Sequence, residues 1–292
     1  MRLLFLPFTR RQTTVVFRNY GCLGALNDLV GVIISKLKAL VGVFANKFNA
    51  LAGVITNKPA IILLAYFFIT SSFQPLHQNT PTITIRFKHW VGNKELKLFD
   101  ETYANPFGEP FVISKFRYYI SHLSFIDVNN KETNLPDNYY LINEEDSLSK
   151  IVELPAAAIK SISFMVGVDS IRNVSGVQTG SLDPLNGMFW TWNSGYVFAK
   201  LEGESDSSHA PVHSFSWHVG GFRQHENALR KIKLTISKNA AASNTIMVNA
   251  DVLKWFNAVR PIKISESPVC HQPGKLAMQI ADNYSAMFSI AP

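Results

Sequence analysis

From residue 82 onward the sequence is a series of short runs in which apolar and polar residues alternate, separated by clusters of Asn, Gly, Pro and Asp. A period of two residues, rich in Val, Ile, Phe, Tyr and Thr, is typical of strands with one buried face. Each strand needs a partner for its backbone and cover for its apolar face. The sequence therefore predicts an all-β fold, an antiparallel β-sandwich with long loops. The expected strands are 82–90, 111–127, 159–168, 195–201, 214–219, 231–237 and 245–248.

Helical patterns are scarce in this part of the chain. Residues 145–151 and 250–258 could each form about two turns, and Asp251 stands where a helix N-cap is expected. We therefore expect one or two short helices in a single domain that spans 80–292.

The excess positive charge of the protein lies in its first part. The whole chain has 28 Lys and Arg against 21 Asp and Glu, but residues 1–75 contain eight of the basic residues and one acid, which leaves 20 of each beyond. A neutral body gives no basic surface for nucleic acid or anionic lipid. We therefore expect no nucleic-acid partner.

Residues 1–55 form a basic leader that contains an internal repeat. Similar eleven-residue segments begin at Leu29, Leu40 and Leu51. An eleven-residue period can belong to a helix that lies on a membrane surface. The other interpretation, which we favour, is a translated DNA repeat ahead of the true gene start. In both cases the segment is left out of the fold argument.

Residues 56–77 have the pattern of a signal peptide. Lys58 is followed by an apolar run over 60–70 and then by small polar residues. The run is too short to cross a bilayer comfortably, since a spanning helix needs ~20 residues. We therefore expect export to a periplasmic or extracellular location, with no stable membrane span in the mature form.

Two stretches contain histidine or tryptophan residues that are candidates for a functional site. Along the first strand His89 continues the apolar face of Ile83, Ile85 and Phe87. In the run Gly-Met-Phe-Trp-Thr-Trp-Asn-Ser-Gly-Tyr of residues 187–196, Trp190 and Trp192 project to the same side as Met188. For the two tryptophans the alternative to a functional role is plain core packing.

Histidines also gather at one place in the sequence. His209, His213 and His218 fall within ten residues, but Pro211 argues against a helical zinc pair, so only a loop site stays open. Imidazole suits copper and zinc, and the lack of negative ligands favours copper. The alternative for each histidine is a solvated or hydrogen-bonded side chain.

Cysteine adds little to these candidates. Cys22 belongs to the leader, so Cys270 would be unpaired in a processed protein, which excludes a disulfide framework and a Cys-based zinc site. An idle thiol is a simpler interpretation of Cys270 than a soft metal ligand beside His271. No hydrolase or nucleotide-binding motif was found, so we expect a protein that is not an enzyme.

Several motifs together resemble those of the MbnP-like family, exported copper-binding proteins associated with methanobactin systems. The most specific is the stretch 180–203, which contains Ser-Leu-Asp-Pro-Leu-Asn-Gly-Met-Phe-Trp-Thr-Trp. Other matches are Tyr-Tyr-Ile-Ser-His-Leu at 118–123, Phe-Met-Val-Gly-Val-Asp-Ser at 164–170, Phe-Ser-Trp-His-Val-Gly-Gly at 215–221 and Asp-Asn-Tyr-Ser-Ala-Met-Phe at 282–288. The resemblance covers residues 82–290.

The resemblance implies an antiparallel β-rich domain outside the cytoplasm that holds one copper ion through histidines. In some members a tryptophan oxidised to kynurenine joins them, and a di-haem peroxidase partner is thought to perform the oxidation. Carried over by position, the tryptophan is Trp192 or Trp190 and the histidines are His89 and His218. His122 is then either a third ligand or incidental.

Two functions follow from these observations. The preferred one is an exported, non-enzymatic copper-binding protein for copper capture or delivery. The alternative is a metal-free β-sandwich binding or surface-interaction module whose tryptophans line a ligand face.

Overall fold

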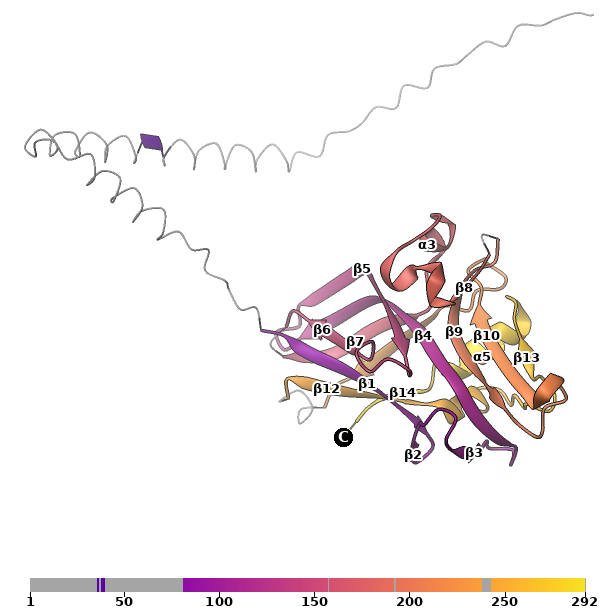
Figure 1. Ribbon diagram of the computed structural model, residues 1–292. Coiled ribbons are helices and arrows are strands. Elements are labelled where there is room, and N and C mark those ends of the chain that lie inside the picture. Colours follow the sequence, from indigo (N-terminus) through magenta and orange to yellow (C-terminus); the bar gives the residue numbers. More distant parts are fainter. Residues whose placement is uncertain are drawn as a thin grey trace, which may run out of the picture. The chain divides into compact units, whose positions relative to one another are not determined.

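The computed structural model describes residues 81–156, 158–191, 193–237 and 243–291, and in the leader only Lys36, Lys38 and Ala39, which are helical. The chain divides into two units, Met1–His77 and Gln78–Pro292, and the second unit carries the sheets (Figure 1). The leader and signal-peptide predictions, 1–55 and 56–77, therefore fall almost entirely outside the described residues. Within the described ranges, no helix is both long and apolar enough to cross a membrane.

One layer of the domain is a five-stranded sheet with β1 at its centre. Its strand order is β14-β12-β1-β2, and β6 pairs with β1 as well. Strands β1 and β12 run parallel, with Thr84 opposite Thr245 and Trp90 opposite Asp251. The strands are β1 (Ile83–Val91), β2 (Lys94–Glu95), β6 (Ile151–Leu154), β12 (Thr245–Asp251) and β14 (Phe288–Ile290).

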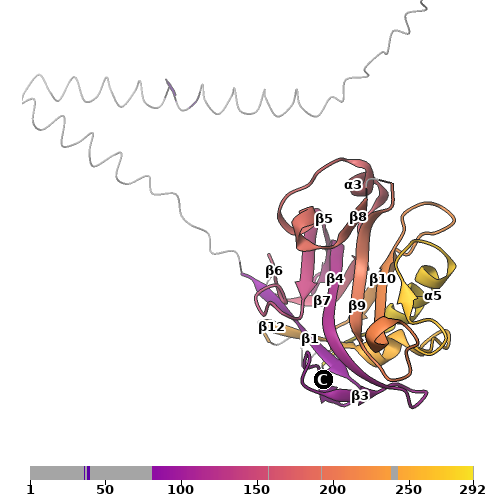
Figure 2. The same cartoon turned by 45° about the vertical axis from the view of Figure 1, so that its right-hand side comes forward.

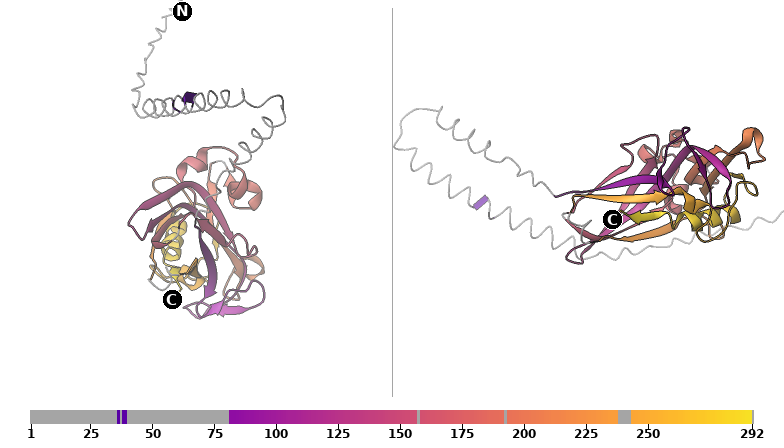
Figure 3. Two further views of the ribbon diagram at one scale, coloured as in Figure 1. Left: turned by 90° about the vertical axis from the view of Figure 1, so that its left-hand side faces the viewer. Right: turned by 90° about the horizontal axis from the view of Figure 1, so that it is seen from below.

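The other layer is a nine-stranded sheet built on the long strand β4. Its order is β11-β7-β4-β9-β10-β13, with β3 and β5 paired to β4 and β8 paired to β9. Figure 2 shows β4 and β9 side by side, and Figure 3 shows the curl of the sheets from two further directions. The strands are β3 (Thr102–Ala104), β4 (Pro110–Asp127), β5 (Glu132–Asn143), β7 (Ile159–Val166), β8 (Phe189–Thr191), β9 (Gly195–Glu204), β10 (Ser214–Gly220), β11 (Arg230–Thr235) and β13 (Val269–Cys270).

The apolar core lies between the two sheets, as alternation in the sequence predicts. Phe87 of β1 packs edge-on against Tyr118 of β4 at 6.2 Å and Phe164 of β7 at 6.1 Å between ring centroids. Ile83, Ile85 and Phe87 are all buried. The predicted β-sandwich is confirmed. The pairing differs in one respect, because β1–β12 and β10–β13 are parallel pairs within otherwise antiparallel sheets. Each of these two pairs joins strands that are far apart in the sequence. The connection between them is long enough for the second strand to run parallel to the first.

The two α-helices described in the domain are short, as predicted, but lie elsewhere. They are α3 (Ser170–Val174) and α5 (Lys275–Tyr284), and α5 lies beside β10 (Figure 2). The helix predicted over 145–151 is wrong, since residues 144–150 form turns and Ile151 begins β6. There the Ser149 hydroxyl donates to the Asn143 carbonyl and Asp146 accepts from the Leu148 amide. These local side-chain bonds replace helical ones.

The second predicted helix, over 250–258, is only a single 3₁₀ turn. Strand β12 continues to Asp251, and the turn η4 (Val252–Trp255) follows it. Asp251 does act as the N-cap, because its carboxylate accepts from the Leu253 amide at 3.0 Å.

A buried carboxylate joins the start of β4 to the loop before β13. Glu109 accepts hydrogen bonds from the Ile264 amide at 2.8 Å, the Ser265 amide at 2.9 Å and the Asn105 side chain at 2.5 Å. Burial alone would raise the pKa of Glu109. The hydrogen bonds from Ser265, Asn105 and Ile264 outweigh burial and hold the pKa below its ordinary value of 4.5.

Replacing this carboxylate gives a pH-dependent prediction. Glu109→Gln should lower the free energy of unfolding by about 1–3 kcal/mol at pH 7, because the amide group turns a donor toward buried donors. A folded-state pKa below 4.5 means that the carboxylate stabilises the native state above that pH and that the stabilisation is lost as the pH falls. Urea denaturation between pH 7 and pH 3 should show a smaller acid-induced loss in the variant than in the parent. An equal loss in both would contradict the assignment.

Candidate metal centre

His89 is a buried histidine whose two ring nitrogens are both engaged. Its Nδ1 lies 2.5 Å from the carboxylate of Glu144, and its Nε2 lies 3.0 Å from the hydroxyl of Tyr118. Lys150 donates to the same carboxylate at 3.0 Å. Burial lowers the pKa of His89, against the opposing effect of Glu144. A ring held on both nitrogens inside the core offers no lone pair to a metal ion without breaking a buried hydrogen bond.

His218 projects from β10 onto the outer face of the nine-stranded sheet. Its Nε2 lies 2.6 Å from the Glu202 carboxylate and 3.1 Å from the Ser216 hydroxyl. Glu202 also faces Lys115 at 3.3 Å and Lys200 at 3.8 Å. The hydrogen bond from His218 and these two charges lower the pKa of Glu202 to about 2, although burial opposes them. The carboxylate is therefore ionised at neutral pH.

A second imidazole, that of His271, stacks on His218. The ring centroids are 4.4 Å apart with an interplanar angle of 28°, and the Nε2 of His271 lies 2.7 Å from the Ser216 hydroxyl. The parallel pairing of β10 with β13, in which Trp217 stands opposite Cys270, puts the two following residues beside each other. Burial and the neighbouring His218 lower the pKa of His271, which favours its neutral, metal-binding form.

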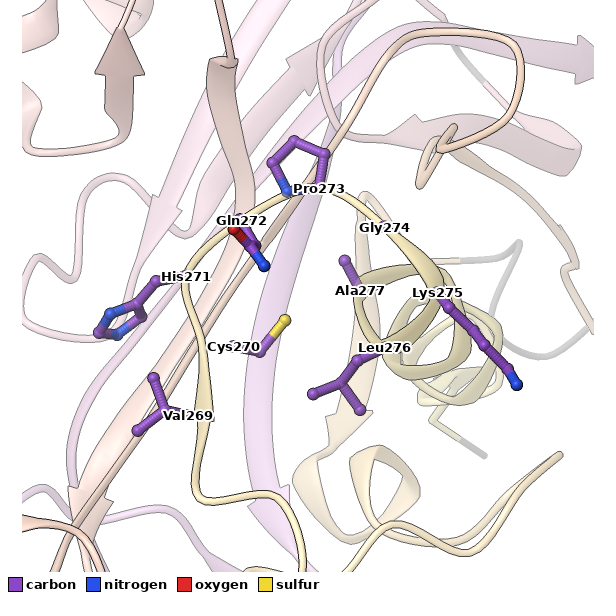
Figure 4. A pocket seen from close by; sticks show the side chains of 9 residues that line it. All are labelled: Val269, Cys270, His271, Gln272, Pro273, Gly274, Lys275, Leu276 and Ala277. Carbon is purple, nitrogen blue, oxygen red and sulfur yellow. The ribbon is translucent and has the colours of Figure 1, made fainter.

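Cys270 does not join this pair. Figure 4 shows the His271 ring on one side of the loop and the Cys270 sulfur on the other, toward Ala277. The thiol is buried, and burial raises its pKa to about 11. It is therefore protonated and faces away from the two imidazoles.

The structure does not bring His89 and His218 together. His89 packs on Phe116 of β4, with ring centroids 4.8 Å apart, on the inner face of the nine-stranded sheet. The next residue, Arg117, pairs with Lys200, which pairs with His218, so these three share the outer face. The backbone of the sheet therefore separates the two imidazoles. Metal–imidazole bonds are ~2 Å long, so a single ion cannot bind both.

His122 lies at a third position. It occupies a bulge in β4 with a left-handed φ of 49°, and its Nε2 is 3.9 Å from the Asp169 carboxylate. Five residues separate it from Arg117, a distance of roughly 16 Å along a strand. His122 therefore lies away from the His218–His271 pair. The loop histidines do not complete a site either, because His213 Nδ1 contacts the Ser208 carbonyl at 3.2 Å and His209 is exposed.

Trp190 is half-buried, and its indole nitrogen is buried without a partner among the described residues. Its ring packs on Gly220, where an added Cβ would lie 2.8 Å from the ring and 2.4 Å from the Tyr196 carbonyl. Gly220 is two residues from His218, which puts the indole in the neighbourhood of the imidazole pair. Trp192 lies outside the described residues.

The stretch 180–187, which precedes Trp190, is held on the outer face by side chains of the sheet. All four bind main-chain carbonyl groups of that stretch, and sequence reasoning did not find them. Tyr119 donates to Ser181 at 2.9 Å, Tyr196 to Leu182 at 2.7 Å, Arg117 to Asn186 at 3.0 Å and Lys200 to Gly187 at 2.7 Å. Part of this stretch therefore serves to fix the loop in place.

The outer face offers few donors for a metal ion. Among the described residues no group of three or more His, Cys, Asp and Glu is arranged to hold a metal ion. The best arrangement is the pair His218 and His271 with Glu202 behind one ring. His271 was missed as a ligand because its proximity depends on the β10–β13 pairing, for which local sequence carries no signal.

The domain is a β-sandwich that carries two stacked histidines on the outer face of its nine-stranded sheet. The family model named MbnP matches residues 80–272, so the chain belongs to the MbnP family. Among solved structures, MbnP from Methylosinus trichosporium is similar with a TM-score of 0.41 and 16% identity, over 60% of this chain and 76% of that chain. A comparison with curated proteins finds no match.

Proposed function

We propose that this protein is an exported, non-enzymatic copper-binding protein that captures or delivers copper, and that His218 and His271 hold the ion. The observation that carries the proposal is the stacking of the two imidazoles at 4.4 Å beside one serine hydroxyl. Membership of the MbnP family supports it, because the resemblance of the motifs implies histidine-bound copper. His271 takes the place that the sequence had suggested for His89.

Glu202 determines which nitrogen of His218 can bind copper. An ionised carboxylate only accepts hydrogen bonds, so the Nε2 that lies 2.6 Å from Glu202 carries the proton. The lone pair of the neutral ring is then on Nδ1, which makes no hydrogen bond to a described residue. A carboxylate behind a ligating histidine fixes the ring and raises its basicity.

The ring of His271 must turn for both lone pairs to meet one ion. In stacked rings the lone pairs point side by side, whereas a bound ion holds two nitrogens within ~4 Å of each other. His271 is exposed and is held mainly by the stacking and by Ser216, so rotation costs little. Copper binding should therefore break the contact between His271 and Ser216.

The donor set favours copper among the divalent ions. Two imidazoles without a thiolate suit copper, zinc and nickel, and copper binds such a site most tightly. The site lies on the surface of the sheet, near Trp190 of β8, which suits reversible transfer. Copper binding by the two histidines does not require that a tryptophan be oxidised.

Copper titration of the purified protein tests the proposal. His218→Gln and His271→Gln should each weaken copper binding at least tenfold, as measured by competition with a chelator of known affinity. His209→Gln is the matched control, since that histidine is exposed, and it should bind like the parent. No stoichiometric binding by the parent would reject the proposal and favour the metal-free binding module. Unchanged binding in the His271 variant would reject the pair.

We also propose that Trp192 or Trp190 is the residue that a di-haem peroxidase partner would oxidise to kynurenine. The unpartnered indole nitrogen of Trp190, close to Gly220, supports a role beyond packing. Peptide mass mapping over 187–200 in protein from its native host should detect the oxidised residue. Two unmodified tryptophans in copper-loaded protein would exclude kynurenine as a ligand here.

A further inference from the structure

One tyrosine in the core differs from the others in what its hydroxyl binds. Tyr118 has no exposed surface, and its hydroxyl lies 3.0 Å from the Nε2 of His89. The other buried tyrosines of the described residues donate to main-chain carbonyls, which accept a hydrogen bond but do not take up a proton. They are Tyr103, Tyr119, Tyr196 and Tyr284. Tyr118 is therefore the buried phenol that is bound to a base.

Glu144 sets the direction of the hydrogen bonds around His89. Its carboxylate lies 2.5 Å from the Nδ1 of His89 and also accepts from Lys150. Burial raises the pKa of Glu144, but the hydrogen bonds from His89 and Lys150 outweigh burial and hold the pKa below its ordinary value of 4.5. The ionised carboxylate only accepts, so the Nδ1 of the neutral ring carries the proton. Nε2 therefore accepts from the Tyr118 hydroxyl.

The hydrogen bonds form a path for a proton from the core to the edge of the domain. The side chain of His89 is fully buried, whereas those of Glu144 and Lys150 keep 15% and 20% of their surface exposed. A proton that leaves the phenol can pass to Nε2 while the Nδ1 proton moves to the carboxylate. Each transfer follows an existing hydrogen bond, so no side chain has to move.

A base is what the oxidation of a buried phenol requires. Loss of one electron leaves a radical cation, which is a strong acid, and an isolated positive charge is costly in an apolar interior. Around Tyr118 this interior consists of the rings of Phe87, Phe116 and Phe288, with centroids 6.2, 5.5 and 5.6 Å away. These rings exclude water from the phenol, so its proton must go to His89.

We propose that Tyr118 is a site of reversible one-electron oxidation, with His89 as the acceptor of its proton. The electron passes to an external one-electron oxidant of the high-valent haem class, the phenol O–H bond breaks, and an N–H bond forms at Nε2. The product is a neutral tyrosyl radical, and reduction by one electron returns the proton to the oxygen. The Glu144 carboxylate, 2.5 Å from Nδ1, stabilises the positive charge that the proton brings to the ring.

Such a site gives the protein an internal electron donor. The burial of Tyr118 keeps the radical away from water and from the tyrosines of other molecules. The radical therefore cannot couple with a second tyrosine and can be reduced again. This role goes beyond copper binding and does not depend on whether His218 and His271 hold the ion.

Photochemical oxidation of the full, metal-free chain tests the proposal. Ruthenium tris-bipyridine, oxidised by a light flash in the presence of an electron acceptor, withdraws one electron from the protein, and electron paramagnetic resonance detects the radical. We expect a long-lived neutral tyrosyl signal in the parent, and a loss of at least tenfold in its amplitude in Tyr118→Phe. Tyr119→Phe and Tyr284→Phe are matched controls and should keep the signal, since each removes a buried hydroxyl that donates to a main-chain carbonyl.

His89→Gln separates the base from the packing. Glutamine keeps a polar partner for the Tyr118 hydroxyl but takes up no proton, so the long-lived signal should fall at least fivefold in a variant whose fold circular dichroism shows to be intact. In the parent, D₂O should slow the formation of the signal at least twofold, because the proton leaves with the electron.

Four results would overturn the proposal: no long-lived signal in the parent, a signal that persists in Tyr118→Phe, equal amplitude in His89→Gln, or equal rates in water and D₂O. None of them affects the copper proposal, because the copper site uses neither Tyr118 nor His89.

Discussion

His89→Ala is expected to lower the free energy of unfolding by about 3–5 kcal/mol while leaving the affinity for copper unchanged. The substitution removes a buried ring that packs against Phe116 and Tyr118, and so leaves a cavity. It also leaves the Tyr118 hydroxyl, which is fully buried, without its 3.0 Å partner. Both effects act on the core and neither reaches the outer face of the nine-stranded sheet.

Guanidinium denaturation measures the first effect, and a copper titration well below the unfolding midpoint measures the second. His89→Gln is a useful companion, because its amide can keep one of the two hydrogen bonds and should recover part of the stability. A folded His89→Ala protein that has lost copper binding would show that His89 is a ligand after all. It would also remove the basis for assigning His271.

Gly220→Ala is expected to destabilise the fold by about 3 kcal/mol and to displace Trp190. An added Cβ would lie 2.4 Å from the Tyr196 carbonyl and 2.8 Å from the Trp190 ring, so either the strand or the indole must move. The change should appear in denaturation curves and as a shift of tryptophan fluorescence. Gly187→Ala is the control, because an added Cβ meets nothing within 4 Å there and only the left-handed backbone is penalised. Equal effects of the two substitutions would contradict close packing at Gly220.

The sequence predicted the strands of the domain better than the partners of its side chains. Alternation placed His89 on the apolar face of β1, and that face is buried in the structure. Alternation alone could not show that Glu144 and Tyr118 take both nitrogens of the ring, because these residues come from distant segments. His218 and His271 meet through a parallel pair of strands, and pairing over such a separation leaves no periodic signal.

Among the elements that the sequence analysis missed, strand β5 and helix α5 were missed for different reasons. Strand β5 contains Asn, Asp and Pro136, which are typical of turns, but a proline is tolerated on an edge strand such as this one. Helix α5 carried a readable signal, since Ala277, Ile280, Ala281 and Tyr284 recur at helical spacing and are buried. Strand β5 depends on its place in the tertiary structure, whereas helix α5 could have been predicted from its periodicity.

The way in which the stretch 180–187 is attached to the sheet determines which of its residues can be substituted. The sheet binds only peptide oxygens of the stretch, but Asp183, Asn186 and the buried Leu182 fix its own shape, which leaves Leu185 as the side chain that contributes least. Leu185, with 92% of its surface exposed, shows how fully such a side chain faces outward. Exchanging exposed residues of the stretch 180–187 should change the surface that the protein presents and leave the imidazole pair unchanged. This stretch is therefore a natural starting point for redesigning the choice of partner.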